Sequence, residues 1–204
     1  MKRCLFLSCK AGHAPSALVS GPWAGRVDFV DQRRFPDLDL GGHGAIVLSM
    51  LTDQASLSRH ADKLDAVLDG GGTVVVNGHV AYPLVSGLQP FMPQTGHGVE
   101  PLRVSRLGDH PVYAGVADDD LTFRRGVAGF YGRGHNPPPN GAVALNGLGP
   151  DRVALDWEWR RPGGGIVFMH CGLDLWAYAN DPTSAARMAP QLMDWLFATS
   201  NGAS

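Results

Sequence analysis

The stretch Gly70-Gly71-Gly72-Thr73-Val74-Val75-Val76-Asn77-Gly78-His79 decides the fold of this chain. Its three glycines predict the end of a helix, because glycine adopts the left-handed backbone of a helix C-cap at little cost. The segment Thr73–Val76 is β-branched throughout, which is typical of a buried parallel strand. A sharp turn after it places His79 at the carboxyl end of the strand, where open α/β sheets bind their ligands.

An amphipathic helix is predicted immediately before this stretch. Thr52 or Asp53 can accept the free N–H groups of its first turn. Apolar residues then recur at helical spacing, at Leu57, Ala61, Leu64, Val67 and Leu68. The apolar run Ala45–Met50 predicts another buried strand. Together these segments predict a right-handed strand–helix–strand crossover in a parallel sheet.

The rest of the chain supplies further strands and one more helix within a single domain that spans residues 1–204. The Gly- and Pro-rich stretch from Phe123 to Asn140 predicts a loop over the site. A last helix is predicted from Asp181-Pro182, a cap followed by proline at the first helical position. Pro190 should kink or split it. The remaining strands are predicted at Cys4–Cys9, Arg26–Asp31, Leu102–Arg106, Ala142–Asn146, Val153–Trp159 and Ile166–His170.

Composition narrows the expected partners and location. The net charge of −2 provides no basic field that would attract nucleic acid or anionic lipid. No apolar stretch approaches the roughly 20 residues that cross a bilayer. The three cysteines form no CxxC motif, which favours a reducing, cytoplasmic setting. We expect a small-molecule ligand, no nucleic-acid or membrane partner, and leave a homo-oligomer open.

Several segments, in their order and spacing, resemble the class I glutamine amidotransferase-like superfamily. Within it the chain looks most like the trehalose-utilisation (ThuA-like) proteins and the middle domain of some β-galactosidases. The resemblance implies an α/β fold, a flavodoxin-like, mainly parallel sheet with helices on both faces. The segments that carry it are Gly71–Gly78, His110-Pro111-Val112-Tyr113-Ala114-Gly115-Val116, Gly163-Gly164-Gly165-Ile166-Val167-Phe168-Met169-His170 and the helix that ends near Trp195.

The resemblance also implies where a glutaminase would carry its catalytic groups. The nucleophilic cysteine of catalytic members corresponds to His79, and their histidine corresponds to His170. Their glutamate corresponds to Gly172, and the nearest acid here is Asp174. An imidazole cannot replace a thiolate in forming a glutamine-derived thioester. We therefore expect no glutaminase activity and leave open whether the chain is an enzyme.

The first functional hypothesis is an amidotransferase-like domain that binds a small polar metabolite such as a sugar. The cleft would lie between His79, His170 and the loop around His135. Aromatic rings suit the C–H faces of sugars, and arginines suit anionic groups. Candidate catalytic residues are His79, His170 and Asp174, and candidate ligand-binding residues are Cys9, Asn77, Tyr82, Arg125, Tyr131, Arg133, His135 and Trp176.

Two alternatives belong to other functional classes. One is a hydrolase or isomerase that uses His79 and His170 as acid–base groups or as metal ligands. No sequence motif indicates a metal, so we predict no resident cofactor, with zinc as the alternative. The other is a non-catalytic interaction module that dimerises through a sheet edge or its aromatic strand. Each histidine can also have a purely structural role, in which it donates a hydrogen bond to a backbone carbonyl group or packs on an aromatic ring.

Overall fold

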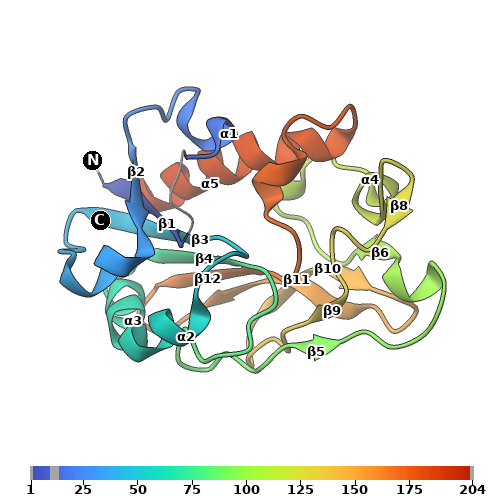
Figure 1. Ribbon diagram of the computed structural model, residues 1–204, viewed down its shortest axis with the longest axis horizontal. Coiled ribbons are helices and arrows are strands. Elements are labelled where there is room, and N and C mark those ends of the chain that lie inside the picture. Colours follow the sequence, from blue (N-terminus) through green and yellow to red (C-terminus); the bar gives the residue numbers. More distant parts are fainter. Residues whose placement is uncertain (1, 10–13, 203–204) are drawn as a thin grey trace.

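The structure, a computed structural model, describes residues 2–9 and 14–202. An eight-stranded sheet forms its centre, in the order β2-β1-β3-β4-β12-β11-β10-β6 (Figure 1). The first five strands in this order run parallel, and the last three extend the sheet in antiparallel pairing. The parallel strands are β2 (Val27–Asp31), β1 (Arg3–Ser8), β3 (His43–Leu48), β4 (Thr73–Asn77) and β12 (Ile166–His170), and the antiparallel strands are β11 (Val153–Arg160), β10 (Val143–Leu148) and β6 (Val104–Arg106).

Strand β4 has parallel neighbours on both sides, as its sequence predicts. Val75 is opposite Val47 of β3 on one side and Phe168 of β12 on the other. All residues of β4 and β12 are buried. Numbered along the chain, the parallel strands have the order 2-1-3-4-5, one of the two common orders of doubly wound sheets. Strand β2 lies at the sheet edge.

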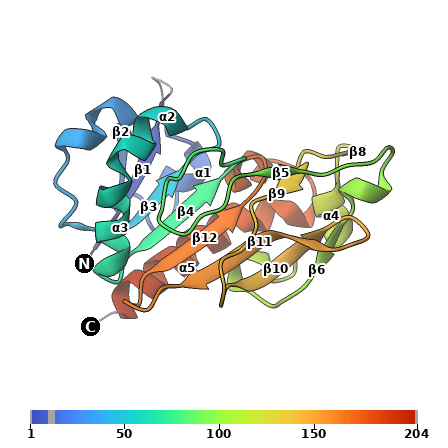
Figure 2. The same cartoon turned by 90° about the horizontal axis from the view of Figure 1, so that it is seen from below.

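Helices cover both faces of the sheet, which confirms the α/β class with a mainly parallel sheet (Figures 1 and 2). Helices α1 (Ser16–Val19) and α5 (Met188–Gly202) pack on one face, and α2 (Gln54–Leu57) and α3 (Ala61–Asp69) on the other. Among the described residues, none of the helices combines the length and apolar character that a bilayer crossing requires. The smaller elements are α4 (Asp118–Thr122), the hairpin pair β7 (Phe123–Arg124) and β8 (Val127–Ala128), and the pair β5 (Met92–Pro93) and β9 (Gly134–His135).

The helix predicted between β3 and β4 is interrupted. Asp53 caps α2, accepting a hydrogen bond from the backbone N–H of Ser56 at 3.0 Å. A 3-10 turn at Ser58–His60 then separates α2 from α3. His60, with φ −126° and ψ 28°, leaves the helical region and breaks the α-type hydrogen bonds. The chain leaves α3 through Gly71, whose φ of 78° requires glycine.

The last helix does not begin as predicted. Asp181 does not cap it, because its carboxylate accepts a hydrogen bond from Arg124 Nε at 2.6 Å instead. The 3-10 turn Ser184–Arg187 begins the helical segment, and Asp120 accepts a hydrogen bond from the Ser184 N–H at 2.8 Å. Pro190 does not split α5, because it lies in the first turn, where a backbone N–H has no helical partner to lose.

Candidate functional site

The carboxyl ends of the parallel strands bring Cys9, Ser49, His79 and His170 to one edge of the sheet. The turn after β4 is tightly built there. Gly78 has a φ of 94°, and a Cβ on it would lie 2.8 Å from the Cα of Met50. Only glycine fits between β4 and the neighbouring loop, so the backbone that presents His79 is fixed in place.

His79 is exposed at this edge, with one face of its ring covered. The ring stacks on Phe91 with 3.9 Å between ring centroids. The Gln54 side chain donates a hydrogen bond to the His79 carbonyl at 2.7 Å. Partial burial lowers the pKa of His79, and the nearby His170 and Arg133 lower it further. The ring is therefore neutral at pH 7 and can both donate and accept a hydrogen bond.

His170 lies close to His79, but its side chain is fully buried on the face of the sheet that α5 covers. Phe168, two residues earlier on the same face, packs on Trp195 of α5 at 5.3 Å. His170 Nδ1 lies 2.6 Å from Asp156 Oδ1, and Nε2 lies 2.9 Å from the Leu173 carbonyl oxygen. With both nitrogens occupied, the ring has no free lone pair to act as a base at the edge of the sheet.

Gly172 occupies the position that the resemblance matches to the glutamate of catalytic members. A Cβ there would overlap the carbonyl oxygen of Tyr131 and lie 2.6 Å from its carbonyl carbon. It would also lie 3.0 Å from Nε2 of His170. The position has no room for a side chain. The carboxylate that reaches His170 comes instead from Asp156 on the neighbouring strand.

Asp174 joins the turn after β12 to the end of β3. Its carboxylate accepts hydrogen bonds from Ser49 Oγ and the Met50 N–H, both at 2.7 Å. Burial raises the pKa of Asp174, whereas these two donors and His170 act in the opposite direction. Asn77 donates to the Leu48 carbonyl at 3.0 Å, and its buried Oδ1 has no hydrogen-bond partner among the described residues. Asp174 and Asn77 therefore both hold the end of β3 and the residues after it in place.

The remaining candidate residues have separate partners. Arg125 pairs with Asp181 at 3.5 Å, and Arg133 donates to the Gly129 carbonyl at 3.0 Å. The Tyr131 hydroxyl is buried against Asp156 at 2.6 Å.

The aromatic candidates and His135 differ mainly in exposure. Tyr82 is 49% exposed, and its loop is fastened because Gln54 Oε1 accepts from the Ala81 N–H at 2.8 Å. Trp176 is 9% exposed and packs edge-on against Phe6. His135 lies in β9, and burial lowers its pKa. Tyr82 and His79 are therefore the exposed rings of the loop after β4.

A cavity of about 320 Å³ lies at the same edge, lined by Cys9, Gln32, Arg33, Asp53 and Ser56. The thiol of Cys9 is exposed and donates to the Leu51 carbonyl. Asp53, which lines this cavity, caps α2, and the next residue, Gln54, donates a hydrogen bond to the His79 carbonyl. The start of α2 therefore contacts both the cavity and the loop of His79. Within the described part of the chain, no three His, Cys, Asp or Glu side chains are grouped to hold a metal ion.

The sequence did not indicate Arg106, Asn146 and Asp156 as part of this region. Asn146 and Asp156 are both 0% exposed, and Asn146 donates to Asp156 at 2.5 Å. Asn146 and Asp156 each follow two apolar residues of their strand, in Ala144-Leu145-Asn146 and Ala154-Leu155-Asp156. Such an interruption signals a buried polar contact, but the partner depends on the pairing of strands.

No protein-family model and no curated protein sequence matches this chain. The fold does match solved structures. Cytoplasmic protein STM3548 from Salmonella typhimurium matches over 95% of this chain and 98% of its own, with a TM-score of 0.57 and 12% identity. Gan42B, a GH42 β-galactosidase from G. stearothermophilus, matches 97% of this chain over 30% of its own length, with a TM-score of 0.46 and 10% identity. At 12% identity, the likeness to the Salmonella protein shows the fold alone.

Proposed function

We propose that this chain is an amidotransferase-like, ThuA-like protein that binds a small polar metabolite of the carbohydrate class and has no glutaminase activity. The ligand would lie at the carboxyl edge of the parallel strands, next to His79 and Tyr82. The protein would act in the cytoplasm, which its three unpaired cysteines favour. The Salmonella protein with a similar fold is also described as cytoplasmic.

One observation carries the proposal: a neutral, exposed imidazole stands at the strand end and stacks on an aromatic ring. Phe91 supports one face of the His79 ring, and the other face presents a flat surface together with a hydrogen-bond donor and acceptor. Tyr82 adds a second exposed ring three residues later. A sugar has the matching combination, an apolar C–H face and a rim of hydroxyl groups.

Three positions are unfavourable for glutaminase activity. Position 79 carries an imidazole where a thiolate would be needed, both nitrogens of His170 are occupied, and Gly172 has no room for an acid. Each change alone would remove an element of the nucleophile–base–acid arrangement that acyl transfer requires. We expect purified protein to release no ammonia from L-glutamine above a boiled control.

Binding is tested by calorimetry against a panel of monosaccharides, disaccharides and polyols. We expect at least one to bind, with affinity about tenfold weaker in His79→Ala and in Tyr82→Ala, which corresponds to roughly 1.4 kcal/mol. His97→Ala is the matched control, because His97 is an exposed histidine on another loop. Unchanged binding by His79→Ala, or no binding across the panel, would refute the proposal.

A second candidate function, acid–base catalysis by His79, is favoured by its lowered pKa. A general base must be unprotonated at the working pH, and His79 meets this condition at pH 7. Incubation of a bound sugar with the protein, followed by one-dimensional NMR, would detect hydrolysis or isomerisation. Conversion that is lost in His79→Gln supports catalysis, and an unchanged ligand over a day supports binding alone.

A further inference from the structure

The ring of Phe91, which supports His79, lies directly against the backbone of Gly134. The centroids of the His79 and Phe91 rings are 3.9 Å apart, and the ring planes differ by 18°. A Cβ on Gly134 would overlap Cζ of Phe91 and lie 2.8 Å from its Cε2. The two segments run side by side because β5 and β9 pair, with Pro93 opposite Gly134. The lack of a side chain at position 134 therefore allows Phe91 to lie where it supports His79.

Asn136 fastens the chain directly after His79. It is 0% exposed, and its Oδ1 accepts a hydrogen bond from the Val80 N–H at 3.2 Å. Its amide nitrogen donates to the carbonyl groups of Val80 and Gln89, both at 2.8 Å. The Phe91 N–H donates to the same Val80 carbonyl at 2.8 Å. One buried amide thus joins the two ends of the loop that separates His79 from Phe91.

Asn136 is itself held by the core of the sheet. Its backbone N–H donates to Cys171 Sγ at 3.0 Å, and its carbonyl accepts from Trp157 Nε1 at 2.9 Å. Cys171 follows β12 and Trp157 belongs to β11, and both residues are 0% exposed. Since every polar group of Asn136 has a partner, the loop after β4 takes its position from the buried strands.

Gln54 of α2 bonds the same short segment near the surface. Its amide nitrogen donates to the His79 carbonyl at 2.7 Å, and its Oε1 accepts from the Ala81 N–H at 2.8 Å. Gln54 and Asn136 together therefore bond three consecutive residues, 79 to 81. The backbone that carries the His79 ring cannot turn without breaking these hydrogen bonds, so the ring is held in place before any ligand arrives.

We propose that Gln54, Gly134 and Asn136 are positioning residues that hold the His79 ring as a rigid platform, and that this platform selects cyclic sugars over open-chain polyols. The platform consists of the His79 ring and the Phe91 ring that supports it. The preference for cyclic sugars rests on the proposed function, whereas the fixed position of the platform does not.

A fixed, flat ring favours a ligand that is itself rigid and flat. A pyranose presents a C–H face without ordering any bond of its ring, and stacking on His79 covers that face. An open-chain polyol carries the same kind of hydroxyl groups, but it must lose rotational freedom in several bonds to form a comparable face. Because the platform cannot adapt to the chain, the polyol loses this entropy without compensation.

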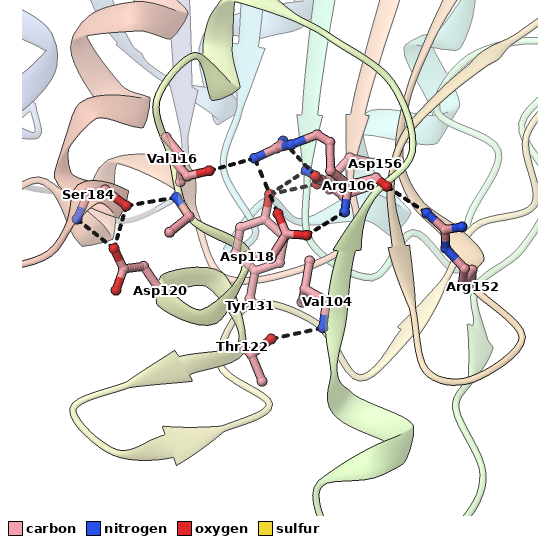
Figure 3. Close-up of polar contacts among 12 residues, drawn as sticks. Val104, Arg106, Val116, Asp118, Asp120, Thr122, Tyr131, Arg152, Asp156 and Ser184 are labelled. Carbon is pink, nitrogen blue, oxygen red and sulfur yellow. Dashed lines mark hydrogen bonds and ion pairs between the residues drawn. The ribbon is translucent and has the colours of Figure 1, made fainter.

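A second set of buried polar contacts, around β6, provides a matched control (Figure 3). Thr122 is 2% exposed, and its hydroxyl accepts a hydrogen bond from the Val104 N–H at 2.9 Å. Asp118 accepts from the Arg106 N–H at 2.8 Å, so these contacts fasten α4 to β6. Strands β12, β11 and β10 lie between β6 and β4. Thr122→Val therefore removes a buried side chain–backbone hydrogen bond that does not reach the platform.

The platform is tested without a ligand by ¹H–¹³C NMR of the histidine rings. His79→Gln assigns the His79 signals by their disappearance. Because the Phe91 ring covers one face of His79 and shields its protons, we expect the His79 ring protons of the wild-type protein upfield of those of the exposed His97. His79 signals that coincide with those of His97 would show that the stack does not form in solution, and the proposal would be wrong.

The positioning role is tested with the same signals in Gln54→Ala, Gly134→Ala and Asn136→Ala. We expect the His79 ring protons to move downfield in each variant, and to stay unchanged in Thr122→Val. Unchanged His79 shifts in the folded variants would overturn the positioning role. Gln54→Ala leaves the buried contacts of the loop intact, so it decides the question if Asn136→Ala does not fold.

The preference for cyclic sugars is tested by calorimetry on the wild-type protein with matched pairs: D-glucose and D-glucitol, D-galactose and D-galactitol, and D-mannose and D-mannitol. We expect the sugar of at least one pair to bind, and to bind about tenfold more tightly than its polyol. A polyol that binds as tightly as its parent sugar, or no binding by any pair, would overturn the preference. The wider panel then decides the proposed function separately, and the NMR shifts decide the platform in either case.

Discussion

Replacing Gly172 with alanine tests whether the loop carrying Tyr131 closes the acid position. The added Cβ would lie 2.6 Å from the carbonyl carbon of Tyr131. Non-bonded carbon atoms pack at about 3.5–4.0 Å, so the Tyr131 backbone or the turn after β12 must move by at least roughly 1 Å. Tyr131 cannot follow freely, because its side chain is 1% exposed and hydrogen-bonded to Asp156 at 2.6 Å.

The expected cost has two parts. Overpacking of a closed site costs about 1–3 kcal/mol. Displacing the Tyr131 hydroxyl from the Asp156 carboxylate removes a hydrogen bond to a charged group, a loss of about 1.5–3 kcal/mol. We therefore expect Gly172→Ala to lower the free energy of unfolding by about 2.5 kcal/mol when the loop relaxes well and by about 6 kcal/mol when it does not.

Urea unfolding followed by tryptophan fluorescence gives the free energy by linear extrapolation. Gly42→Ala is the matched control, because a Cβ on Gly42 meets no heavy atom within 4 Å. Its effect should stay within about 0.5 kcal/mol. If Gly172→Ala is as mild as this control, the position is open to side chains, and the steric argument against an acid at residue 172 is wrong.

Three further predictions concern the same edge of the sheet. Asp53→Ala should cost about 1 kcal/mol in the same urea assay, because it removes the acceptor for the Ser56 N–H; no change would show that the cap is dispensable. In native protein, a thiol reagent should label only Cys9, since burial raises the pKa of the other two cysteines; labelling of a second thiol before unfolding contradicts this. The lowered pKa of His79 means that the unfolded chain binds more protons below the ordinary value of 6.5. The free energy of unfolding of wild type relative to His79→Gln should therefore fall from about pH 7 to about pH 5, and a rise would contradict the direction of the shift.

Much of the parallel half of the sheet could be predicted from local sequence. Continuous apolar, β-branched segments such as Thr73–Asn77 are buried on both faces wherever helices cover a sheet. The glycines that flank them also indicate where strands begin and turns follow. The helix boundaries were less accurate, because they depend on tertiary contacts. Asp120, more than sixty residues away, supplies the acceptor at the start of the last helical segment.

The surroundings of His170 could not be predicted in the same way. The sequence placed it at a strand end and suggested Asp174 as its acid. Its partner, Asp156, is set by the antiparallel register of β11 against β12, and a shift of one residue would turn that side chain to the other face. The closed space at Gly172 depends on Tyr131, which the sequence placed in the Gly- and Pro-rich loop over the site. Long-range pairing thus decided the chemistry of these residues.

The two histidines of the edge illustrate why position in a fold does not fix a role. His79 follows β4 and His170 is the last residue of β12, so both stand at carboxyl strand ends, yet of the two rings only that of His79 is exposed to a ligand. His170 is enclosed by its own partners. A glutaminase would need a thiol at residue 79, a released Nε2 on residue 170 and an acid beside it. Tyr131 and the His170–Asp156 pair are part of the core. Releasing Nε2 of residue 170 and adding an acid beside it would therefore destabilise the fold. This favours ligand binding over acyl transfer at this edge.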